Sequence, residues 1–389
     1  MKIEERMGTL RADFESHFGM KPVAAAYAPG RVEVLGNHTD YNEGLVLSAA
    51  INYGTCILAA PVQGSECRLY DGKFKESACF PTDVRGPSPK PAWANYLKGV
   101  YALLRDRAGV AVPAVNVWIE GDVPLGAGLS SSAALEMAAT LALGSVLKVQ
   151  LELRDIARLG QKAEHEYAGV RCGLLDQITS LFGQDSALVE TDFRTLAVTT
   201  VPLDPDLEFL IANTAVKHNL VDSAYNERRA KCEEAARFFA GVLPHPVRAL
   251  RDVSPAEWQT FSGQMDPVSA RRSAHVVGEI DRVQRGAGLL KRGKWREFGA
   301  LMFESHESSR TQFENSCPEL DHLVTTAQAI PEVLGARLSG GGFGGSAVVL
   351  VPCSAAEAVT EKLVASYRQA FGHPCDVLCM RASAGARLL

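Results

Sequence analysis

The sequence predicts a mixed α/β protein built from two domains. Strand-like and helix-like segments alternate along the chain without any repeat or low-complexity segment, a pattern typical of α/β or α+β folds. The chain has 389 residues, which exceeds the size at which a single hydrophobic core usually keeps growing. Hydrophobic residues make up 47% and charged residues 22%, so a large core can form. We therefore expect two domains that share a cleft.

The N-terminal half is expected to combine extended segments with buried helices. Residues 23–60 suggest a short strand, a turn at Pro29-Gly30, and two further strands, VEVLG and LVLSAAI. Val115 to Glu120 predicts another strand. Ala133 to Leu147 is apolar but too short to span a bilayer, and therefore predicts a buried helix. Leu151 to Tyr167 has apolar residues at helical spacing and predicts a second helix.

A domain boundary is predicted at Val201 to Asp206, where VPLDPD places two prolines and acidic residues between ordered segments. It divides the chain into domains 1–205 and 206–389. An amphipathic helix from Ser223 to Phe239 follows, and helices dominate the next hundred residues.

The glycine run Gly340 to Gly345 satisfies the letters of GxGxxG but does not predict a dinucleotide-binding fold. That fingerprint requires a helix directly after the glycines, whereas Ser346 to Val351 and the preceding Ala336 to Ser339 both predict strands. The run is thus either a tight bend or flexible backbone lying against a ligand or a neighbouring loop. A helix that Ser354 and Glu357 could open as a capping box comes next.

Composition favours a small-molecule partner. The net charge is −5 and no cluster of lysines and arginines occurs, which argues against nucleic acid or an anionic membrane. Nine cysteines include no CxxC pair, and Cys375 and Cys379, in the predicted closing strand Cys375 to Met380, have no histidines arranged around them as in a zinc site. The N-terminus has neither signal-peptide nor transit-peptide character. We expect reduced thiols, a cytoplasmic location and a monomer, with an oligomer left open.

The segment PLGAGLSSSAA, from Pro124 to Ala134, predicts a phosphate cradle. Gly126 and Gly128 let the backbone bend tightly and approach a ligand. Three serines lie where a helix would begin: Ser130, Ser131 and Ser132. Free N–H groups and the positive end of the helix dipole would converge there on an anion. The lysine of a Walker loop is missing, and a plain serine N-cap is the alternative.

A second polar segment, GRVEVLGNHTDYNEG from Gly30 to Gly44, suits a polyhydroxylated ligand. It brings Arg31, Asn37, His38, Asp40 and Asn42 into one short polar stretch. Asp40 can accept two hydroxyl protons, whereas Asn37 and His38 each donate and accept, so together they can distinguish the stereochemistry of a sugar. An Asx-rich surface turn is the alternative.

Taken in order, these segments resemble the three motifs of the GHMP small-molecule kinases, and within them the galactokinases. The resemblance is carried by Ala28 to Gly44, Val123 to Glu136 and Ala336 to Val351, together with WANYLKG, QKAEHEYAGVRCGLLDQ and VKHNLVDSAYNERRAKCEE. It implies an N-terminal domain like ribosomal protein S5 domain 2, a ferredoxin-like C-terminal domain, and an active site in the interdomain cleft. It also implies ATP as phosphoryl donor and the C1 hydroxyl of galactose as acceptor.

The resemblance assigns roles to matching residues. The catalytic pair would be Asp176, which orients or deprotonates the attacking hydroxyl, and Arg31. The sugar would be bound by Asn37, His38, Asp40, Gly173 and Tyr225. ATP would be bound by Pro124, Gly126, Gly128, Ser130, Ser131, Ser132, Ala133 and Trp93. The glycine-rich loop would comprise Gly340, Gly341, Gly342 and Gly344. Mg²⁺ would be held by Ser132 and Glu164.

One position departs from the family pattern. Galactokinases usually carry glutamate where this chain has Asn37, and asparagine where it has Glu33. Asn37 can still bind the C6 hydroxyl, but without the strength of a carboxylate. A sugar 1-kinase with altered C6 specificity, for galacturonate or N-acetylgalactosamine, is therefore an alternative.

Other classes fit less well. A non-catalytic galactose and ATP sensor would carry a deletion in the serine loop, which is complete here. A nicotinamide-dependent oxidoreductase would need a helix after Gly345. A kinase for mevalonate, homoserine or another alcohol would lack HTDYN.

Overall fold

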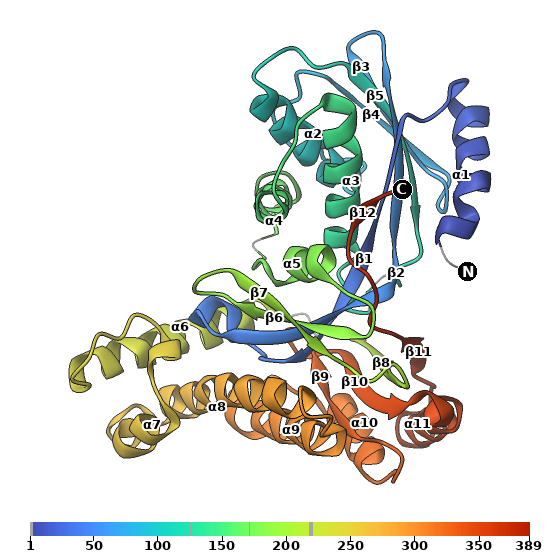
Figure 1. Ribbon diagram of the computed structural model, residues 1–389. Helices are drawn as coiled ribbons and strands as arrows, with labels where there is room; N and C mark the ends of the chain where they lie inside the picture. The colour runs from blue at the N-terminus through green and yellow to red at the C-terminus, as the bar shows by residue number, and fades with distance from the viewer. Residues whose placement is uncertain (1–2, 125, 171, 218–220) are drawn as a thin grey trace.

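The computed structural model, which describes residues 3–124, 126–170, 172–217 and 221–389, has two parts, each built on its own β-sheet (Figure 1). The first sheet contains β1 (Ala24–Leu35), β2 (Leu45–Val62), β3 (Glu66–Asp71), β4 (Glu76–Pro81), β5 (Ala114–Gly121), β6 (Ala187–Asp192), β7 (Ala197–Pro202) and β12 (Arg387–Leu388). The second contains β8 (Leu207–Lys217), β9 (Gly335–Ser339), β10 (Gly344–Pro352) and β11 (Asp376–Met380). Both sheets are antiparallel except where β3 pairs with β5.

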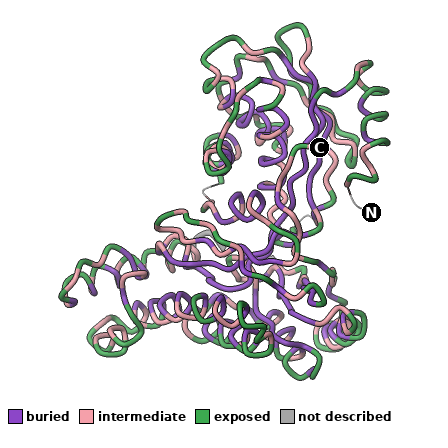
Figure 2. The backbone as a smooth tube through the Cα atoms, in the orientation of Figure 1, coloured by how far each residue is buried: buried purple, intermediate pink, exposed green. Residues whose placement is uncertain are grey.

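Most α-helices of the described chain cover the faces of these sheets. In order they are α1 (Ile3–Phe18), α2 (Ala94–Ala108), α3 (Ser131–Leu147), α4 (Leu153–Ala163), α5 (Leu175–Phe182), α6 (Val221–Val242), α7 (Pro255–Phe261), α8 (Pro267–Leu290), α9 (Trp295–Ser308), α10 (Pro318–Gln328) and α11 (Ala356–Phe371). Helices α2 to α5 lie on one side of the first sheet and α1 lies on the other, whereas α8 to α11 lie below the second sheet (Figure 1). Helices α6 and α7 instead pack against α8. The helix and strand residues turned toward these contacts are buried (Figure 2).

One hydrophobic core joins the two parts. Val32 of β1 and Leu47 of β2 belong to the same buried cluster as Phe209 of β8, Val348 of β10 and Phe298 of α9. Because close-packed interiors resist deformation, this joint fixes the second half of β1 relative to both sheets. The residues that follow β1 therefore stand on a rigid support.

The described structure corrects three local predictions. Strand β1 runs through Pro29 and Gly30, where only a shift of register occurs, so no turn forms there. Helix α11 begins at Ala356 and its N-cap residue has no side-chain hydrogen bond, so the capping box of Ser354 and Glu357 does not form. The predicted helix 151–167 ends at Ala163 and continues as a single π-helical turn, Glu164–Ala168.

The predicted boundary near residue 205 falls between β7 and β8, the first strand of the second sheet. The C-terminal end of the chain does not follow a simple division into two consecutive domains, because β12 pairs with β1 of the first sheet. The split into 1–205 and 206–389 remains a prediction.

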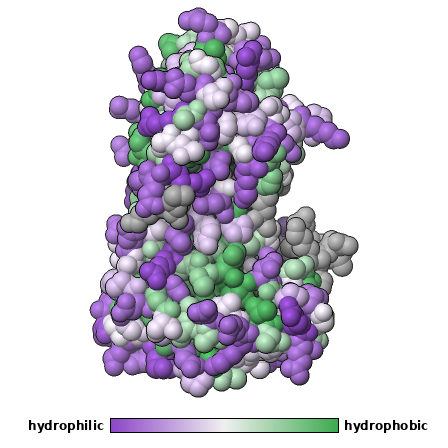
Figure 3. Space-filling model, turned by 90° about the vertical axis from the view of Figure 1, so that its right-hand side faces the viewer, coloured by the Kyte–Doolittle hydropathy of each residue, from purple (hydrophilic) through white to green (hydrophobic). Residues whose placement is uncertain are grey.

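Seen from the side of α1, the surface is mainly hydrophilic above and carries a group of apolar side chains below (Figure 3). Among the described helices, none is long and apolar enough to cross a membrane.

Candidate active site

Arg31, Ser130 and Asp176 meet at one point between β1, α3 and α5. Arg31 Nε donates to Asp176 Oδ1 over 2.8 Å, and its terminal NH2 nitrogen lies 2.6 Å from the same oxygen. The Ser130 hydroxyl donates to the other oxygen, Oδ2. Arg31 also donates through NH1 to the carbonyl of Gly128, 2.6 Å away. The predicted catalytic pair is thus in contact, and it is tied to the serine loop.

Glycine at position 30 makes this meeting possible. A Cβ built on Gly30 would lie 2.5 Å from the backbone carbonyl oxygen of Leu129, closer than real contacts allow. The same carbonyl accepts a hydrogen bond from the Arg31 amide over 3.0 Å. Only a residue without a side chain lets β1 approach the serine loop this closely.

The serine loop does not behave as a plain helix cap. Helix α3 begins at Ser131, and the preceding Ser130 adopts a left-handed conformation with φ of 56° and no side-chain capping bond. Its hydroxyl points to Asp176 instead. A non-glycine residue with positive φ is uncommon and costs conformational energy, and such residues cluster at functional sites.

The residues predicted to bind a sugar surround one cavity of about 870 Å³. Its lining combines β1, the loop after it, the turn before α5, α6 and the glycine-rich loop. The predicted residues among the lining are Arg31, Asn37, His38, Asp40, Gly173, Asp176, Tyr225, Gly340 and Gly341. Segments from residues 31 to 341 therefore converge on a single polar space.

The pKa values of Asp40 and His38 shift in opposite directions in this cavity. Burial, and then the charge of Glu33, raise the pKa of Asp40 to about 6. Burial lowers the pKa of His38 to about 3, so its ring is neutral. Tyr41 Oη lies 3.0 Å from His38 Nδ1, and the Gly341 carbonyl lies 3.2 Å from Nε2. A neutral ring that donates from Nε2 and accepts at Nδ1 satisfies both contacts.

The loop that carries these residues is anchored by α8. Glu279 Oε2 accepts hydrogen bonds from the amides of Gly36 and Asn37, each over 3.0 Å. Burial opposes ionisation of Glu279, but the neighbouring Arg282 guanidinium holds its pKa below the usual range. A buried carboxylate in α8 thus fixes the backbone of the sugar-binding motif.

The glycine-rich loop is a turn between β9 and β10, as the strand pattern predicted. Its carbonyls face the sugar motif, because Gly340 O accepts from Asn37 Nδ2 over 2.7 Å. Gly342, with φ of 81°, packs against the backbone of Asn315, where a Cβ would lie 2.1 Å from the carbonyl oxygen. Gly344 begins β10. In this structure the loop lies against its neighbouring loop rather than at the start of a helix.

Buried carboxylates lie beside the catalytic pair. Glu164 begins the π-helical turn. Its side chain is buried, although glutamate on a helix is usually exposed to solvent. Gln177 Nε2 bridges Glu164 and Glu136, lying 3.1 Å and 3.2 Å from their Oε2 atoms. Burial raises the pKa of both carboxyls, and the thiol of Cys172, which donates to Glu164 Oε2 over 3.0 Å, opposes the shift of the Glu164 pKa.

A second cavity, of about 410 Å³, also borders the serine loop. Phe74, Trp93 and Tyr96 give it aromatic walls, and Ser131 and Ser132 are among its lining residues. Trp93 is half-buried and donates from Nε1 to Glu76 Oε2 over 2.8 Å. The predicted adenine-side aromatic residue therefore stands in the same cavity as the predicted phosphate loop.

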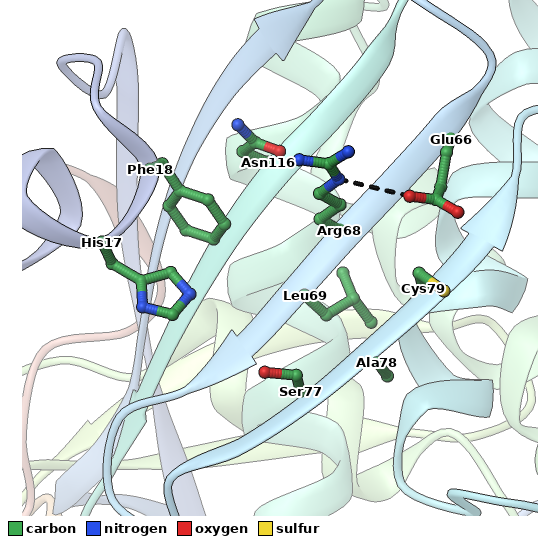
Figure 4. Close-up of a pocket in the computed structure, with 9 residues that line it drawn as sticks. All are labelled: His17, Phe18, Glu66, Arg68, Leu69, Ser77, Ala78, Cys79 and Asn116. Carbon is green, nitrogen blue, oxygen red and sulfur yellow. Dashed lines mark hydrogen bonds and ion pairs between the residues drawn. The ribbon is translucent and has the colours of Figure 1, made fainter.

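A third cavity lies away from this centre, between α1 and strands β3 to β5 (Figure 4). His17 and Phe18 of α1 face Asn116, Arg68 and Glu66 on the sheet. Arg68 Nε donates to Glu66 over 3.2 Å, and both side chains are more than half exposed, at 66% and 53%. Its charged groups are paired and solvated, so this cavity offers none of the convergent, buried chemistry of the first two.

Comparison with known proteins decides the family. The profile of the GHMP kinases N terminal domain matches residues 95–184, that of the galactokinase galactose-binding signature matches 12–61, and that of the GHMP kinases C terminal domain matches 287–369. A galactokinase of Glaesserella parasuis is 37% identical over 97% of this chain and 98% of its own length. Human galactokinase is 38% identical over 100% of this chain and 98% of its own. This chain belongs to the galactokinase family.

The fold agrees with that of a solved galactokinase. The crystal structure of Lactococcus lactis galactokinase complexed with galactose superposes with a TM-score of 0.89, at 31% identity over 98% of this chain and 100% of that one. A mevalonate kinase structure superposes with a TM-score of 0.62 at 18% identity, which reflects the shared GHMP kinase fold alone. The predicted two-domain GHMP kinase fold and the enzyme class are confirmed, and the oxidoreductase and sensor alternatives lose their support.

Sequence reasoning missed several galactokinase residues around the sugar motif. Glu33 was noted only as a departure from the family pattern, although its place two residues after Arg31 on a strand puts both side chains on one face. Glu279, Asn315 and Arg337 had no local signal, because they approach from α8, from the segment before α10, and from β9.

Proposed function

We propose that this galactokinase transfers the γ-phosphoryl group of ATP to the C1 hydroxyl of galactose, giving galactose 1-phosphate and ADP. The observation that carries the proposal is the contact of Arg31 and Asp176, which line the larger cavity, with Ser130, whose neighbours Ser131 and Ser132 line the smaller one. A sugar in the larger cavity and a nucleotide in the smaller one would meet at this point.

Asp176 is proposed to orient the attacking hydroxyl. Both of its oxygens already accept hydrogen bonds, from Arg31 and Ser130, so the carboxylate is held in a fixed position. Phosphoryl transfer passes through a loose transition state in most analyses, and positioning contributes more than early proton removal. The hydroxyl proton then passes to this carboxylate as the new P–O bond forms.

Arg31 is proposed to stabilise the moving phosphoryl group. Its guanidinium is held by the Asp176 carboxylate and the Gly128 carbonyl, so its orientation is set before substrates bind. A planar, permanently charged donor suits the charge on the equatorial oxygens.

The sugar is proposed to lie along β1, with its far side toward the HTDY segment. Asp40 would accept hydrogen bonds from ring hydroxyls, and the neutral His38 would donate to them. Tyr225 would add a hydroxyl from α6. Gly173 leaves room for the Asp40 carboxylate, since a Cβ there would lie 2.5 Å from Asp40 Oδ2. Asn37 remains in the proposed sugar set through its contact with Glu33.

ATP is proposed to enter through the smaller cavity, with its base against Trp93. The phosphates would follow the loop toward the start of α3, where backbone N–H groups are free. The proposed phosphate contacts are Pro124, Gly126, Gly128, Ser130, Ser131, Ser132 and Ala133.

Mg²⁺ is proposed to accompany the nucleotide, held by Ser132 and Glu164. The residue types fit this hard cation, because Ser132 offers a hydroxyl in the first turn of α3 and Glu164 offers a buried carboxyl group. Buried Glu136 and Glu164 place carboxyl oxygens here, and Glu136 Oε1 has no hydrogen-bond partner among the described atoms. When bound, the ion would supply positive charge that neutralises the phosphates. Among the described residues, no cluster of three or more histidine, cysteine, aspartate or glutamate side chains is arranged to hold a metal ion.

We place the enzyme in the cytoplasm as a monomer. All nine cysteines are free thiols, which suits a reducing compartment. Size-exclusion chromatography with light scattering tests the monomer.

ADP release on a sugar panel tests the proposed reaction. We expect turnover with galactose and little with glucose, arabinose, galacturonate or N-acetylgalactosamine. Asp176→Asn should abolish turnover while ATP binding, followed by calorimetry, remains. An active Asp176→Asn enzyme would contradict the role of Asp176. Better turnover of galacturonate or N-acetylgalactosamine than of galactose would favour the alternative sugar 1-kinase.

A further inference from the structure

Glu33 lies on the wall of the sugar cavity, close to the reacting centre. It follows Arg31 by two residues on β1, and the pairing with β2 is regular between them, opposite Ala50 and Ser48. Both side chains therefore leave the same face of the strand, about 7 Å apart along it. Glu33 is 6% exposed and lines the same cavity as Asp176. That separation is comparable to the length of a hexose.

The Glu33 carboxylate is held firmly by one of its two oxygens. Oε1 accepts from Arg337 NH1 over 3.0 Å and from Asn37 Nδ2 over 2.9 Å. The Arg337 side chain has no solvent exposure, so this ion pair is buried on its arginine side. Two donors on one oxygen fix the orientation of the carboxylate.

The other oxygen, Oε2, has no donor among the described residues. Oε2 is not one of the fully buried polar atoms without a partner. Because it lacks a partner, it must therefore retain accessible surface. The cavity is the space that Glu33 lines, and an acceptor without a donor there suits a ligand hydroxyl.

The charge of Glu33 reaches the neighbouring sugar residues. It is the largest cause after burial of the raised pKa of Asp40, and it also contributes to the raised pKa of Tyr225. Glu33 therefore belongs to the electrostatic environment of the cavity as well as to its wall.

Asn37, by contrast, uses both ends of its amide within the protein. Nδ2 donates to Glu33 and to the Gly340 carbonyl, and Oδ1 accepts from Asn315 Nδ2 over 3.0 Å. Relative to the family pattern, glutamate and asparagine have exchanged places between positions 33 and 37. The exchange keeps one carboxylate and one amide in mutual contact beside Arg337.

We propose that Glu33 is a specificity-determining residue that accepts a hydrogen bond from the C6 hydroxyl of the sugar, and that Asn37 is the positioning residue that holds its carboxylate. This inference rests on the proposed function. The C1 hydroxyl lies at Asp176 and the opposite end of the hexose reaches Glu33. A carboxylate at C6 would meet like charge, so galacturonate is excluded although position 37 carries no charge.

The test compares galactose with 6-deoxygalactose, which differs only by the C6 hydroxyl. In the unmodified enzyme kcat/KM should favour galactose by about 100-fold or more, because a buried acceptor is left unpaired by the deoxy sugar. Glu33→Gln should lower kcat/KM for galactose by about 10- to 100-fold, mainly through KM, and change 6-deoxygalactose by less than about threefold. Equal losses on both sugars, or no preference in the unmodified enzyme, would overturn the proposal.

A second variant guards against misfolding, because Glu33→Gln leaves Arg337 without its counter-charge. Glu33→Asn/Asn37→Glu restores the usual family order and retains the ion-pairing group. We expect it to keep the preference for galactose within about threefold. Collapse of the preference in this folded variant would refute the shared role of the two positions. Absence of any galactose-dependent ADP release by the unmodified enzyme would instead refute the proposed function, whatever Glu33 does.

Discussion

Ser130 donates its hydroxyl proton to the carboxylate of Asp176 from a left-handed backbone conformation. One residue of the serine loop is thereby joined to the turn that presents the acceptor-facing aspartate. The strain at Ser130 is sustained because the loop is also held by Arg31, which donates to the Gly128 carbonyl. The proposed phosphate loop and the proposed acceptor site are therefore joined by side-chain contacts before either substrate binds.

Ser130→Ala is expected to misalign Asp176 and lower kcat. Loss of one hydrogen bond to a charged group corresponds to about a 10- to 100-fold decrease. Steady-state kinetics with galactose and ATP measure it. Ser186→Ala is the matched control, since Ser186 has a similar φ of 53° but lies at a distant turn before β6. Equal effects of the two substitutions would show that backbone strain, rather than the contact with Asp176, is responsible.

Gly173→Ala is expected to disturb sugar binding without affecting ATP. The added methyl would lie 2.5 Å from Asp40 Oδ2, so the carboxylate must turn away from its present position. Displacement of a positioned group by about 1 Å can lower the reaction rate by up to about 100-fold. We expect KM for galactose to rise at least about tenfold. Gly86→Ala, where nothing lies within 4 Å of the new Cβ, is the control. An unchanged galactose KM would remove Asp40 from the sugar site.

Asp40→Asn is expected to stabilise the fold while abolishing activity. The folded-state pKa of Asp40 is raised to about 6 from its usual value, so the native state favours the protonated form. The stabilising contribution of this group is complete below the unfolded pKa and is lost as pH rises through 6, which leaves a penalty at neutral pH.

Removal of the charge should add about 1 to 3 kcal/mol to the free energy of unfolding at pH 8, and less at pH 5. Urea unfolding of both proteins at pH 8, 6.5 and 5 measures the difference. A gain that is absent at pH 8, or that does not change with pH, would contradict the raised pKa. Galactose-dependent ADP release by the variant should fall to background, because the main acceptor for ring hydroxyls is lost.

The serine loop, the sugar motif and the strand after the glycines could be predicted because each depends on neighbouring residues. Glycine positions, apolar alternation and the start of α3 are local properties. The contacts of Glu279 with Asn37 could not be predicted, because 242 residues separate them and a buried helical glutamate has no distinctive pattern. The same holds for Arg337 and Glu33, 304 residues apart. The predicted capping box of Ser354 and Glu357 does not form, because a short 3₁₀ turn, Cys353–Ala355, precedes α11 and shifts the start of that helix.

Trp93 is expected to support the nucleotide base, since it shares a cavity with Ser131 and Ser132. Trp93→Ala would remove an aromatic surface whose stacking corresponds to about a tenfold change in affinity, so KM for ATP should rise by that factor with little change in KM for galactose. Trp93→Phe keeps a stacking face but loses the bond to Glu76, and should remain within about threefold of the unmodified enzyme. A selective rise in galactose KM, or equal effects of both substitutions, would place the base elsewhere and assign the cavity of Trp93 a structural role.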